Sequence, residues 1–242
     1  MPKFGLIGHP AAESKSPALF AAAYSGRYTY EIIEEEDFDK AFKRFISEDF
    51  KAVNVTAPHK RAAADCADWR SPDVERIGAA NILVKTPSGE VEAFNSDVLA
   101  VRKLIDGLDI RSAIVIGLGG AGKAAFDACL QAGLKTSFLH HDELYCKTFV
   151  SGDGDCPGGF AFTDNSVAAD LVIYTLPKSV PGIENIRCRY LLEANYLTPC
   201  CSELPGVDHY ISGDQWLKAQ AILGYGLMTG EEPDAEAITS AI

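Results

Sequence analysis

The sequence has little basic charge and no long apolar run, and each shortage excludes a class of protein. Its 22 Lys and Arg stand against 34 Asp and Glu, a net charge of −12, which repels a phosphodiester backbone and argues against a nucleic-acid partner. No stretch of 18 apolar residues occurs, so we expect no membrane span. The first residues lack the basic, apolar and cleavage regions of a signal peptide, which favours a cytoplasmic protein.

Paired-cysteine motifs are also missing. The cysteines are odd in number and scattered, and none form a CxxC pair, the spacing typical of a zinc clasp or a dithiol redox cycle. We therefore expect buried or idle thiols and no metal site. The seven cysteines are Cys66, Cys129, Cys146, Cys156, Cys188, Cys200 and Cys201.

Apolar residues are plentiful, at 47% of 242 residues, enough for the core of one large or two modest domains. Short apolar runs alternate with helix-like segments such as 37–47, where Phe38, Ala41 and Phe45 repeat at helical spacing. This alternation predicts an α/β fold with parallel sheets covered by helices. The strand-like runs are 3–8, 28–33, 51–55, 113–117, 136–139, 169–174 and 190–194.

Three further patterns predict local structure only. Two short runs around "TPSGE", within 80–94, indicate a hairpin. The acidic run 34–39 fits a solvated helix start, because acids there favour the helix dipole. The stretch "SGDGDCPGG" at 151–159 is typical of a surface loop.

A glycine-rich turn at 114–125, "IVIGLGGAGKAA", marks a nucleotide site. A buried strand runs into Gly117, Gly119 and Gly122 in a GxGxxG pattern, and an alanine-rich helix follows. The glycines allow a tight turn and close approach of a pyrophosphate, and free amides at the helix start, including Gly120 and Ala121, bind the anion. The alternative is a tight strand-to-helix turn without a ligand.

The next strand of such a unit should end near a group that selects the nucleotide, roughly 20 residues further on. An acid there suits the ribose diol of NAD, and a base suits the 2′-phosphate of NADP. Here "FLHHDE" offers His140, His141 and Asp142 but no arginine.

Polar residues follow two of the amino-terminal strand-like runs. "SKSP" supplies Ser14 and Ser16, two hydroxyls that suit a small carboxylate; helix capping is the alternative. "NVTAPHK" places Thr56 at a strand end and Lys60 in the first turn of a helix. A lysine there opposes the dipole preference, which mildly favours a functional role, although a solvated surface lysine is still the default interpretation.

Two shorter stretches, "GAAN" at 78–81 and "NSD" at 95–97, complete the set. Asp97 precedes an apolar, helix-like segment, so by itself it indicates a helix cap. Each of these motifs is weak alone.

Taken together and in order, these stretches resemble the shikimate dehydrogenase family. That family reads a GxP turn followed by SxSP, then NVTxPxK, GAxN, NTD and a glycine-rich dinucleotide turn. This chain has "GHPAAESKSP", "NVTAPHK", "GAAN", "NSD" and "GLGGAG" in that order, and "KAQA" at 218–221 is similar to the family's last motif. Five ordered matches are far more specific than any one of them.

The resemblance implies an enzyme with two domains. Residues 1–97 plus 218–242 would form an α/β substrate-binding domain, and 98–217 a Rossmann-like NAD(P)-binding domain. The family reduces 3-dehydroshikimate to shikimate, a step in chorismate and aromatic amino acid biosynthesis. We therefore expect a small-molecule substrate, NADP(H) as cofactor with NAD(H) possible on the residues, and a monomer or homodimer.

The resemblance also assigns residue roles. Lys60 and Asp97 would form the catalytic pair. The substrate would contact Ser14, Ser16, Thr56, Asn81, Tyr196 and Gln220. The dinucleotide would lie against Gly117, Gly119, Gly120, Ala121, Gly122, His140, His141 and Asp142.

Departures from the family pattern keep alternatives open. The family's arginine for the 2′-phosphate is absent near Asp142, although His141 or Lys147 offers a substitute cation, and the family's GLGM has become 213–216, "GDQW". One alternative is an NAD-dependent quinate or shikimate dehydrogenase. A second is a family member that binds substrate or nucleotide without turnover, and a bare nucleotide-binding module is the third.

Overall fold

The computed structural model describes residues 1–139 and 167–242. Its contacts divide the chain into two compact units: unit 1 comprises Met1–Ala100 and Lys218–Ile242, and unit 2 comprises Val101–Leu217. The boundaries fall inside two helices, α5 (Ser96–Ile105) and α8 (Gly213–Thr229). No described helix has both the length and the apolar character needed to cross a membrane.

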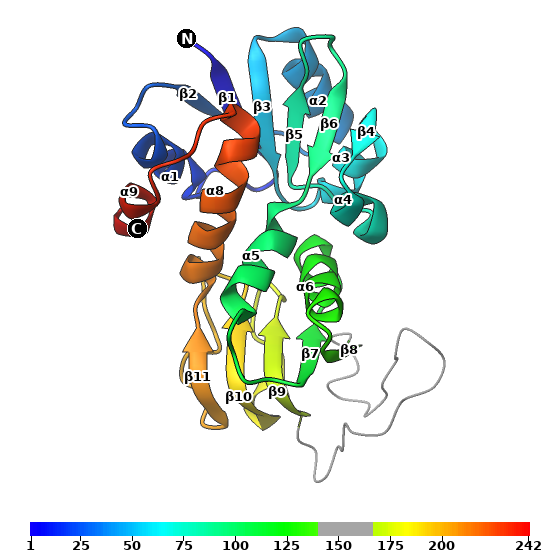
Figure 1. Ribbon diagram of the computed structural model, residues 1–242, viewed down its shortest axis with the longest axis vertical. Helices are drawn as coiled ribbons and strands as arrows, with labels where there is room; N and C mark the ends of the chain where they lie inside the picture. Colours follow the sequence, from blue (N-terminus) through cyan, green and yellow to red (C-terminus); the bar gives the residue numbers. More distant parts are fainter. Residues whose placement is uncertain (140–166) are drawn as a thin grey trace. The chain divides into compact units, whose positions relative to one another are not determined.

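Unit 1 is built on a mixed sheet with the strand order β2-β1-β3-β5-β6-β4 (Figure 1). β1 pairs in parallel with β2 and β3, whereas β5 is antiparallel to β3 and β6. β5 and β6 form the predicted hairpin, which is why this sheet is not wholly parallel. The strands are β1 (Lys3–Gly8), β2 (Thr29–Glu34), β3 (Phe50–Val55), β4 (Trp69–Arg70), β5 (Ile82–Lys85) and β6 (Val91–Phe94).

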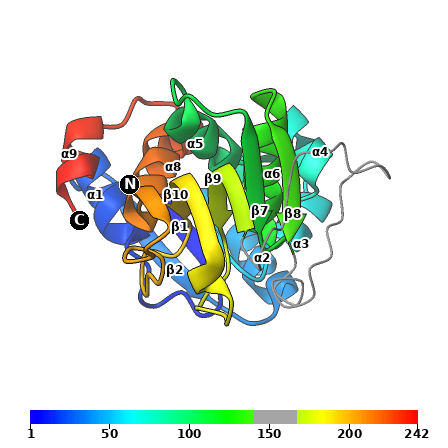
Figure 2. The same ribbon diagram turned by 90° about the horizontal axis from the view of Figure 1, so that it is seen from below.

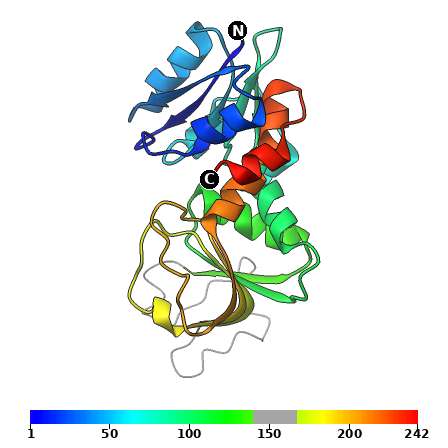
Figure 3. The same ribbon diagram turned by 90° about the vertical axis from the view of Figure 1, so that its left-hand side faces the viewer.

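Helices cover both faces of this sheet, because successive strand residues point to opposite sides. Ile7 and Val53 pack with Phe45 of α2 on one face, and Phe4 packs with Phe20 of α1 on the other. Figure 3 shows α2 in light blue on one side of the sheet and α1 with α9, in blue and red, on the other. The helices are α1 (Ser16–Ala23), α2 (Phe38–Ser47), α3 (Lys60–Asp65), α4 (Pro72–Ile77) and α9 (Ala235–Ser240), with part of α5 and α8.

The strand directions give unit 1 two chemically different edges. β1, β3 and β6 run the same way, so the segments that follow them leave from one edge, called here the carboxyl edge. These segments contain Ser14, Ser16, Lys60 and Asp97. Asn81 lies at the same edge, because it directly precedes the antiparallel β5. Ligands of open α/β sheets bind at this kind of edge.

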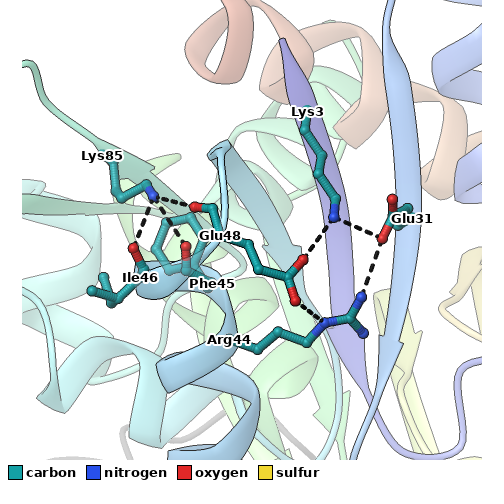
Figure 4. A network of polar contacts seen from close by, with 7 residues as sticks. All are labelled: Lys3, Glu31, Arg44, Phe45, Ile46, Glu48 and Lys85. Carbon is teal, nitrogen blue, oxygen red and sulfur yellow. Dashed lines mark hydrogen bonds and ion pairs between the residues drawn. The ribbon is translucent and has the colours of Figure 1, made fainter. Parts of the chain in front are cut away.

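The opposite edge carries a ring of ion pairs, shown in Figure 4. The Lys3 Nζ lies 2.9 Å from Glu31 and 2.7 Å from Glu48, and Arg44 contacts the same two carboxylates at 3.2 and 2.7 Å. Lys85 donates to three carbonyls at the end of α2, those of residues 45, 46 and 48. These bonds satisfy carbonyls that a helix end leaves without partners.

Unit 2 holds a parallel sheet with the order β11-β10-β9-β7-β8. α6 (Gly120–Gln131) packs on β7, β8 and β9, and Figure 2 shows it running alongside β7 and β8. Among the described strands the chain order switches sides between β7 and β9, the position at which doubly wound sheets bind ligands. The strands are β7 (Ser112–Ile116), β8 (Lys135–Leu139), β9 (Val167–Tyr174), β10 (Ile186–Glu193) and β11 (Val207–Ile211), and η1 (Ile183–Asn185) precedes β10.

The α/β class predicted from the alternation is confirmed, as is the hairpin. Asp37 caps α2 by accepting the Asp39 amide, so the acidic run does lead into a helix start. β4 and β11 were not predicted: β4 has only two residues, and in β11 polar residues interrupt the apolar run. β10 begins earlier than expected, because Arg187 and Arg189 alternate with buried residues. The predicted loop at 151–159 lies outside the described residues.

Candidate active site

A buried ion pair joins Lys60 and Asp97. The Lys60 Nζ lies 2.5 Å from the Asp97 Oδ2, and the two side chains are only 15% and 9% exposed. They are 37 residues apart in the chain. Both charges leave water, which costs free energy that the pairing must offset. A buried pair is weak evidence for stability, so this one is a candidate for a functional role.

Backbone structure fixes both members of the pair. β3 ends at Val55, and Lys60 is the first residue of α3, in the first helical turn as the sequence predicts. The Lys60 carbonyl accepts the Ala80 amide at 2.8 Å, which ties α3 to the segment before β5. Asp97 lies in the first turn of α5, directly after β6.

The predicted role of Asp97 as a helix cap is wrong, because Asn95 caps α5. The Asn95 Oδ1 accepts the amides of Asp97 at 3.0 Å and Val98 at 3.2 Å. The Asn95 Nδ2 donates to the Ala79 carbonyl at 2.9 Å, so this amide is held at both ends. The Asp97 carboxylate is thereby left for Lys60. Asparagine is itself a preferred N-cap residue, so the sequence did contain the pattern that identifies Asn95 as the cap.

Ser96 connects two of the predicted substrate-binding residues. The Asn81 Nδ2 donates to the Ser96 Oγ at 3.1 Å, and the Ser96 amide donates back to the Asn81 Oδ1 at 2.8 Å. The Ser96 Oγ donates to the Gln220 Oε1 at 3.1 Å, across 124 residues of sequence. Ser96 is fully buried. Sequence reasoning missed it, because a serine between two motif residues has no pattern of its own.

The two serines of "SKSP" also interact. The Ser14 Oγ lies 3.1 Å from the Ser16 Oγ and accepts the Ser16 amide at 3.2 Å, so Ser14 satisfies one amide at the start of α1. Ser16 is buried, and its carbonyl accepts a hydrogen bond from the Tyr225 hydroxyl of α8 at 3.2 Å. α8 also packs on Ser96, since a Cβ added at Gly224 would lie 2.8 Å from the Ser96 Oγ. α8 therefore contacts both polar groups of unit 1.

Thr56 follows β3 and packs against the end of β1. A Cβ added at Gly8 would overlap the Thr56 Cγ2, so glycine is needed where these two segments meet. The Thr56 hydroxyl has no hydrogen-bond partner among the described residues, which leaves it available to a ligand.

The structure places the predicted substrate-binding residues in both units. Tyr196 differs from the rest, because it belongs to unit 2 and follows β10. Its backbone is packed closely against the start of α8, where a Cβ on Gly213 would lie 2.7 Å from the Tyr196 nitrogen. The others lie at the carboxyl edge of unit 1 or, for Gln220, hydrogen-bonded to it: Ser14, Ser16, Thr56, Lys60, Asn81, Asp97 and Gln220.

In unit 2 the glycine turn runs from β7 into α6. Gly117 has a φ of 92°, a conformation that favours glycine, and a Cβ on Gly122 would overlap the Gly117 carbonyl oxygen. Thr175, directly after β9, donates to the carbonyls of Ile116 at 2.9 Å and Gly117 at 3.1 Å. Hydrogen bonds from Thr175 therefore hold the glycine turn in place between β7 and β9, where the strand order changes direction.

The start of α6 is suited to hold a dinucleotide phosphate. Gly119 is the N-cap residue and makes no side-chain cap bond, so the first amides of α6, including those of Gly120 and Ala121, are not satisfied by a cap. A Cβ added at Gly119 would meet nothing within 4 Å, which leaves room for a pyrophosphate beside the helix dipole. The predicted ribose-side residues His140, His141 and Asp142 lie outside the described residues.

Together, the strand orders and the glycine turn define a two-unit α/β protein whose second unit has a Rossmann-like fold. A family model described as the shikimate dehydrogenase substrate binding domain matches residues 6–83, all within unit 1. With the relatives described next, this match shows that the chain is similar to shikimate dehydrogenases, most specifically in the substrate-binding half.

Two relatives and one solved structure that are similar to this chain are named shikimate dehydrogenase. A shikimate dehydrogenase (NADP(+)) from Anaeromyxobacter dehalogenans is 36% identical over 138 residues, which cover 54% of this chain and 49% of that protein. The matched region thus spans about half the length of the first curated relatives. A shikimate dehydrogenase (NADP(+)) from Shewanella woodyi is 27% identical, covering 97% of this chain and 94% of that protein. The structure of shikimate 5-dehydrogenase from Thermus thermophilus in complex with NADP(H) and shikimate superposes with a TM-score of 0.79 at 24% identity, covering 100% of this chain and 98% of that one.

Proposed function

We propose that this protein is a shikimate dehydrogenase, which reversibly reduces 3-dehydroshikimate to shikimate with NADP(H). The observation that carries the proposal is the buried Lys60–Asp97 pair at the carboxyl edge of unit 1. The relatives named shikimate dehydrogenase (NADP(+)) support it. Unit 1 would bind the substrate and unit 2 the dinucleotide.

Lys60 supplies the proton that the reaction needs. When a hydride adds to a carbonyl carbon, negative charge develops on the oxygen, and a positioned ammonium group neutralises it. The nicotinamide supplies that hydride when it is bound. In the reverse direction Lys60 accepts the proton of the hydroxyl group as a neutral amine. Asp97, 2.5 Å from the Lys60 Nζ, holds the amine in place and stabilises its charged form.

The remaining polar residues of unit 1 would orient the substrate. Ser14 and Ser16 would donate to its carboxylate, and Thr56 would contact a ring hydroxyl. The amide groups of Asn81 and Gln220 would do the same, and Ser96 already holds both in fixed orientations. Such preorganisation lowers the ordering cost of binding. Tyr196 of unit 2 completes the proposed set.

NADP(H) is the proposed cofactor, because the named relatives use it and the open turn at Gly119 suits a pyrophosphate. An acid at Asp142 favours NAD by the usual rule, which keeps an NAD-dependent quinate or shikimate dehydrogenase as the second candidate. The enzyme would act in the cytoplasm in chorismate and aromatic amino acid biosynthesis, as a monomer or homodimer.

An assay of purified protein tests the proposal. Shikimate and quinate are each offered with NADP and with NAD, and nicotinamide absorbance is followed. We expect the fastest reduction with shikimate and NADP. Faster reaction with quinate or NAD would favour the second candidate, and no reduction in all four combinations by folded protein would reject both enzymes.

A further inference from the structure

Three metal-ligating side chains converge in unit 2, after the end of β10. The ligand atoms of Glu193, Cys200 and Cys201 all lie within 4.8 Å of one another. Glu193 and Cys201 are fully buried, and Cys200 is partly buried. None of the three belongs to the substrate or dinucleotide residues proposed above.

The chain builds this cluster from a strand end and the loop that follows it. Glu193 is the last residue of β10, and its Oε1 accepts the Cys200 amide at 2.8 Å. Its Oε2 accepts the Cys201 amide at 3.3 Å and the hydroxyl of Tyr210, on the neighbouring strand β11, at 2.6 Å. The backbone of the cysteines is thus held against the carboxylate, and both thiols also form hydrogen bonds with it.

The buried Glu193 carboxyl group has no basic partner among the described side chains. None of the lysines or arginines that the structure describes forms an ion pair with it, although buried carboxylates are normally paired or bound to a metal. A divalent cation would supply the missing positive charge.

The donor set selects the class of metal. Two sulfurs and one carboxylate oxygen suit a borderline-soft ion such as Zn²⁺ rather than Mg²⁺ or Ca²⁺, which take oxygen ligands. With Zn–S near 2.3 Å and Zn–O near 2.1 Å, a tetrahedral ion needs ligand atoms about 3.6–3.8 Å apart. Closing the present spread of at most 4.8 Å therefore requires movements of about 1 Å.

We propose that Glu193, Cys200 and Cys201 bind one zinc-class divalent ion, with a fourth position open to water. The ion would link the end of β10 to the middle of the loop that follows it, and Tyr196 lies in the stretch between these ligands. The absence of a CxxC motif led us to expect no metal. The ligands here are instead two adjacent cysteines and a glutamate seven positions earlier, which a search for spaced pairs does not find.

Cobalt(II) is the probe, added to the full-length protein after metal removal with a chelator. Expected are thiolate-to-cobalt charge-transfer absorption that saturates at one ion per chain, and its loss when zinc is added. Cys200→Ser, Cys201→Ser and Glu193→Gln each remove a ligand. Tyr210→Phe removes only the hydrogen bond to Glu193 and should weaken binding about 10- to 100-fold, with larger losses for the three ligand variants.

Cys66→Ser is the matched control, because Cys66 is a partly buried thiol of unit 1. It should bind cobalt as the unchanged protein does. Circular dichroism establishes that each variant is folded. The proposal is overturned if the folded protein gives no thiolate band, or if the band survives Cys200→Ser and Cys201→Ser. Loss of the band only on substitution of Cys146 or Cys156 would place the ion elsewhere and also overturn it.

Discussion

Two lysine–carboxylate clusters lie at opposite edges of the same sheet in unit 1. At one edge, Lys3 and Arg44 share Glu31 and Glu48 in a closed ring of four contacts. The acids and Arg44 of this ring are 37% to 42% exposed, although Lys3 itself is 19% exposed. At the carboxyl edge, Lys60 meets one acid, and neither side chain is more than 15% exposed.

The difference separates a solvated structural network from a candidate catalytic pair. Exposed ion pairs cost little to form and contribute little, because water and salt screen them. A buried pair loses solvation that the attraction barely repays, so stability alone does not account for it. Position points the same way, since only the Lys60–Asp97 pair lies where parallel strands end and ligands bind.

The largest expected effect follows from removing the buried pair. Lys60→Ala or Asp97→Ala should lower kcat by about 10²- to 10⁴-fold, the usual contribution of a positioned proton donor. Lys3→Ala, which removes the lysine of the exposed ring, should leave kcat near its original value. Steady-state rates with shikimate and NADP, combined with circular dichroism, measure both. Unchanged turnover in a folded Lys60 variant would falsify the assignment.

Two glycines of the dinucleotide turn should respond differently. Gly122→Ala places a Cβ on the Gly117 carbonyl oxygen, so we expect a lower melting temperature and lost nucleotide binding. Gly119→Ala adds a Cβ where no protein atom lies within 4 Å, so the melting temperature should hold while NADPH binding weakens. Thermal unfolding and fluorescence titration with NADPH separate the two. Equal nucleotide affinity in Gly119→Ala and the unchanged protein would place the pyrophosphate elsewhere.

Ser96→Ala should give an intermediate effect. It removes the hydroxyl shared by Asn81 and Gln220, and loss of a buried hydrogen-bond partner costs about 1–3 kcal/mol. We expect lower stability in urea and a higher KM for shikimate, because both amides lose their fixed orientation. Ser88→Ala, in the exposed β5–β6 turn, is the control. A stability loss with unchanged KM would give Ser96 a structural role only.

The smallest effect concerns the exposed ring. The hydrogen bond to Glu48 raises the pKa of Lys3 above its usual 10.5, so the stabilisation is complete below that value and is lost as pH rises through the raised pKa. The bonds from Arg44 and Lys3 lower the pKa of Glu48 below its usual 4.5, so that contribution is lost as pH falls below 4.5. Lys3→Ala should therefore lower the melting temperature by at most about 2–4 °C between these limits, and less in high salt. If Lys3→Ala lowered the melting temperature by the same amount outside that pH range, the ion pairs of the ring could not be the cause of the change.

Much of the fold could be read from the sequence, since strand and helix periods depend on near neighbours. The alternation of elements, the hairpin and the glycine turn are examples. β11 and the early start of β10 were missed, because their polar residues interrupt the apolar runs. The resemblance directed attention to Lys60 and Asp97, and their catalytic role stays a prediction. Asn95, the actual cap of α5, was visible in "NSD" but passed over for Asp97.

By itself, the sequence determined the order of its motifs, its acidic balance and its α/β class. Only the tertiary structure decided that Ser96 joins Asn81 to Gln220, that Asn95 frees Asp97 for Lys60, and that Glu193 faces two cysteines. The physical reason is the sequence separation over which each kind of interaction acts. Periodicity and capping act over a few residues, whereas these contacts depend on which strands are neighbours and where each strand ends.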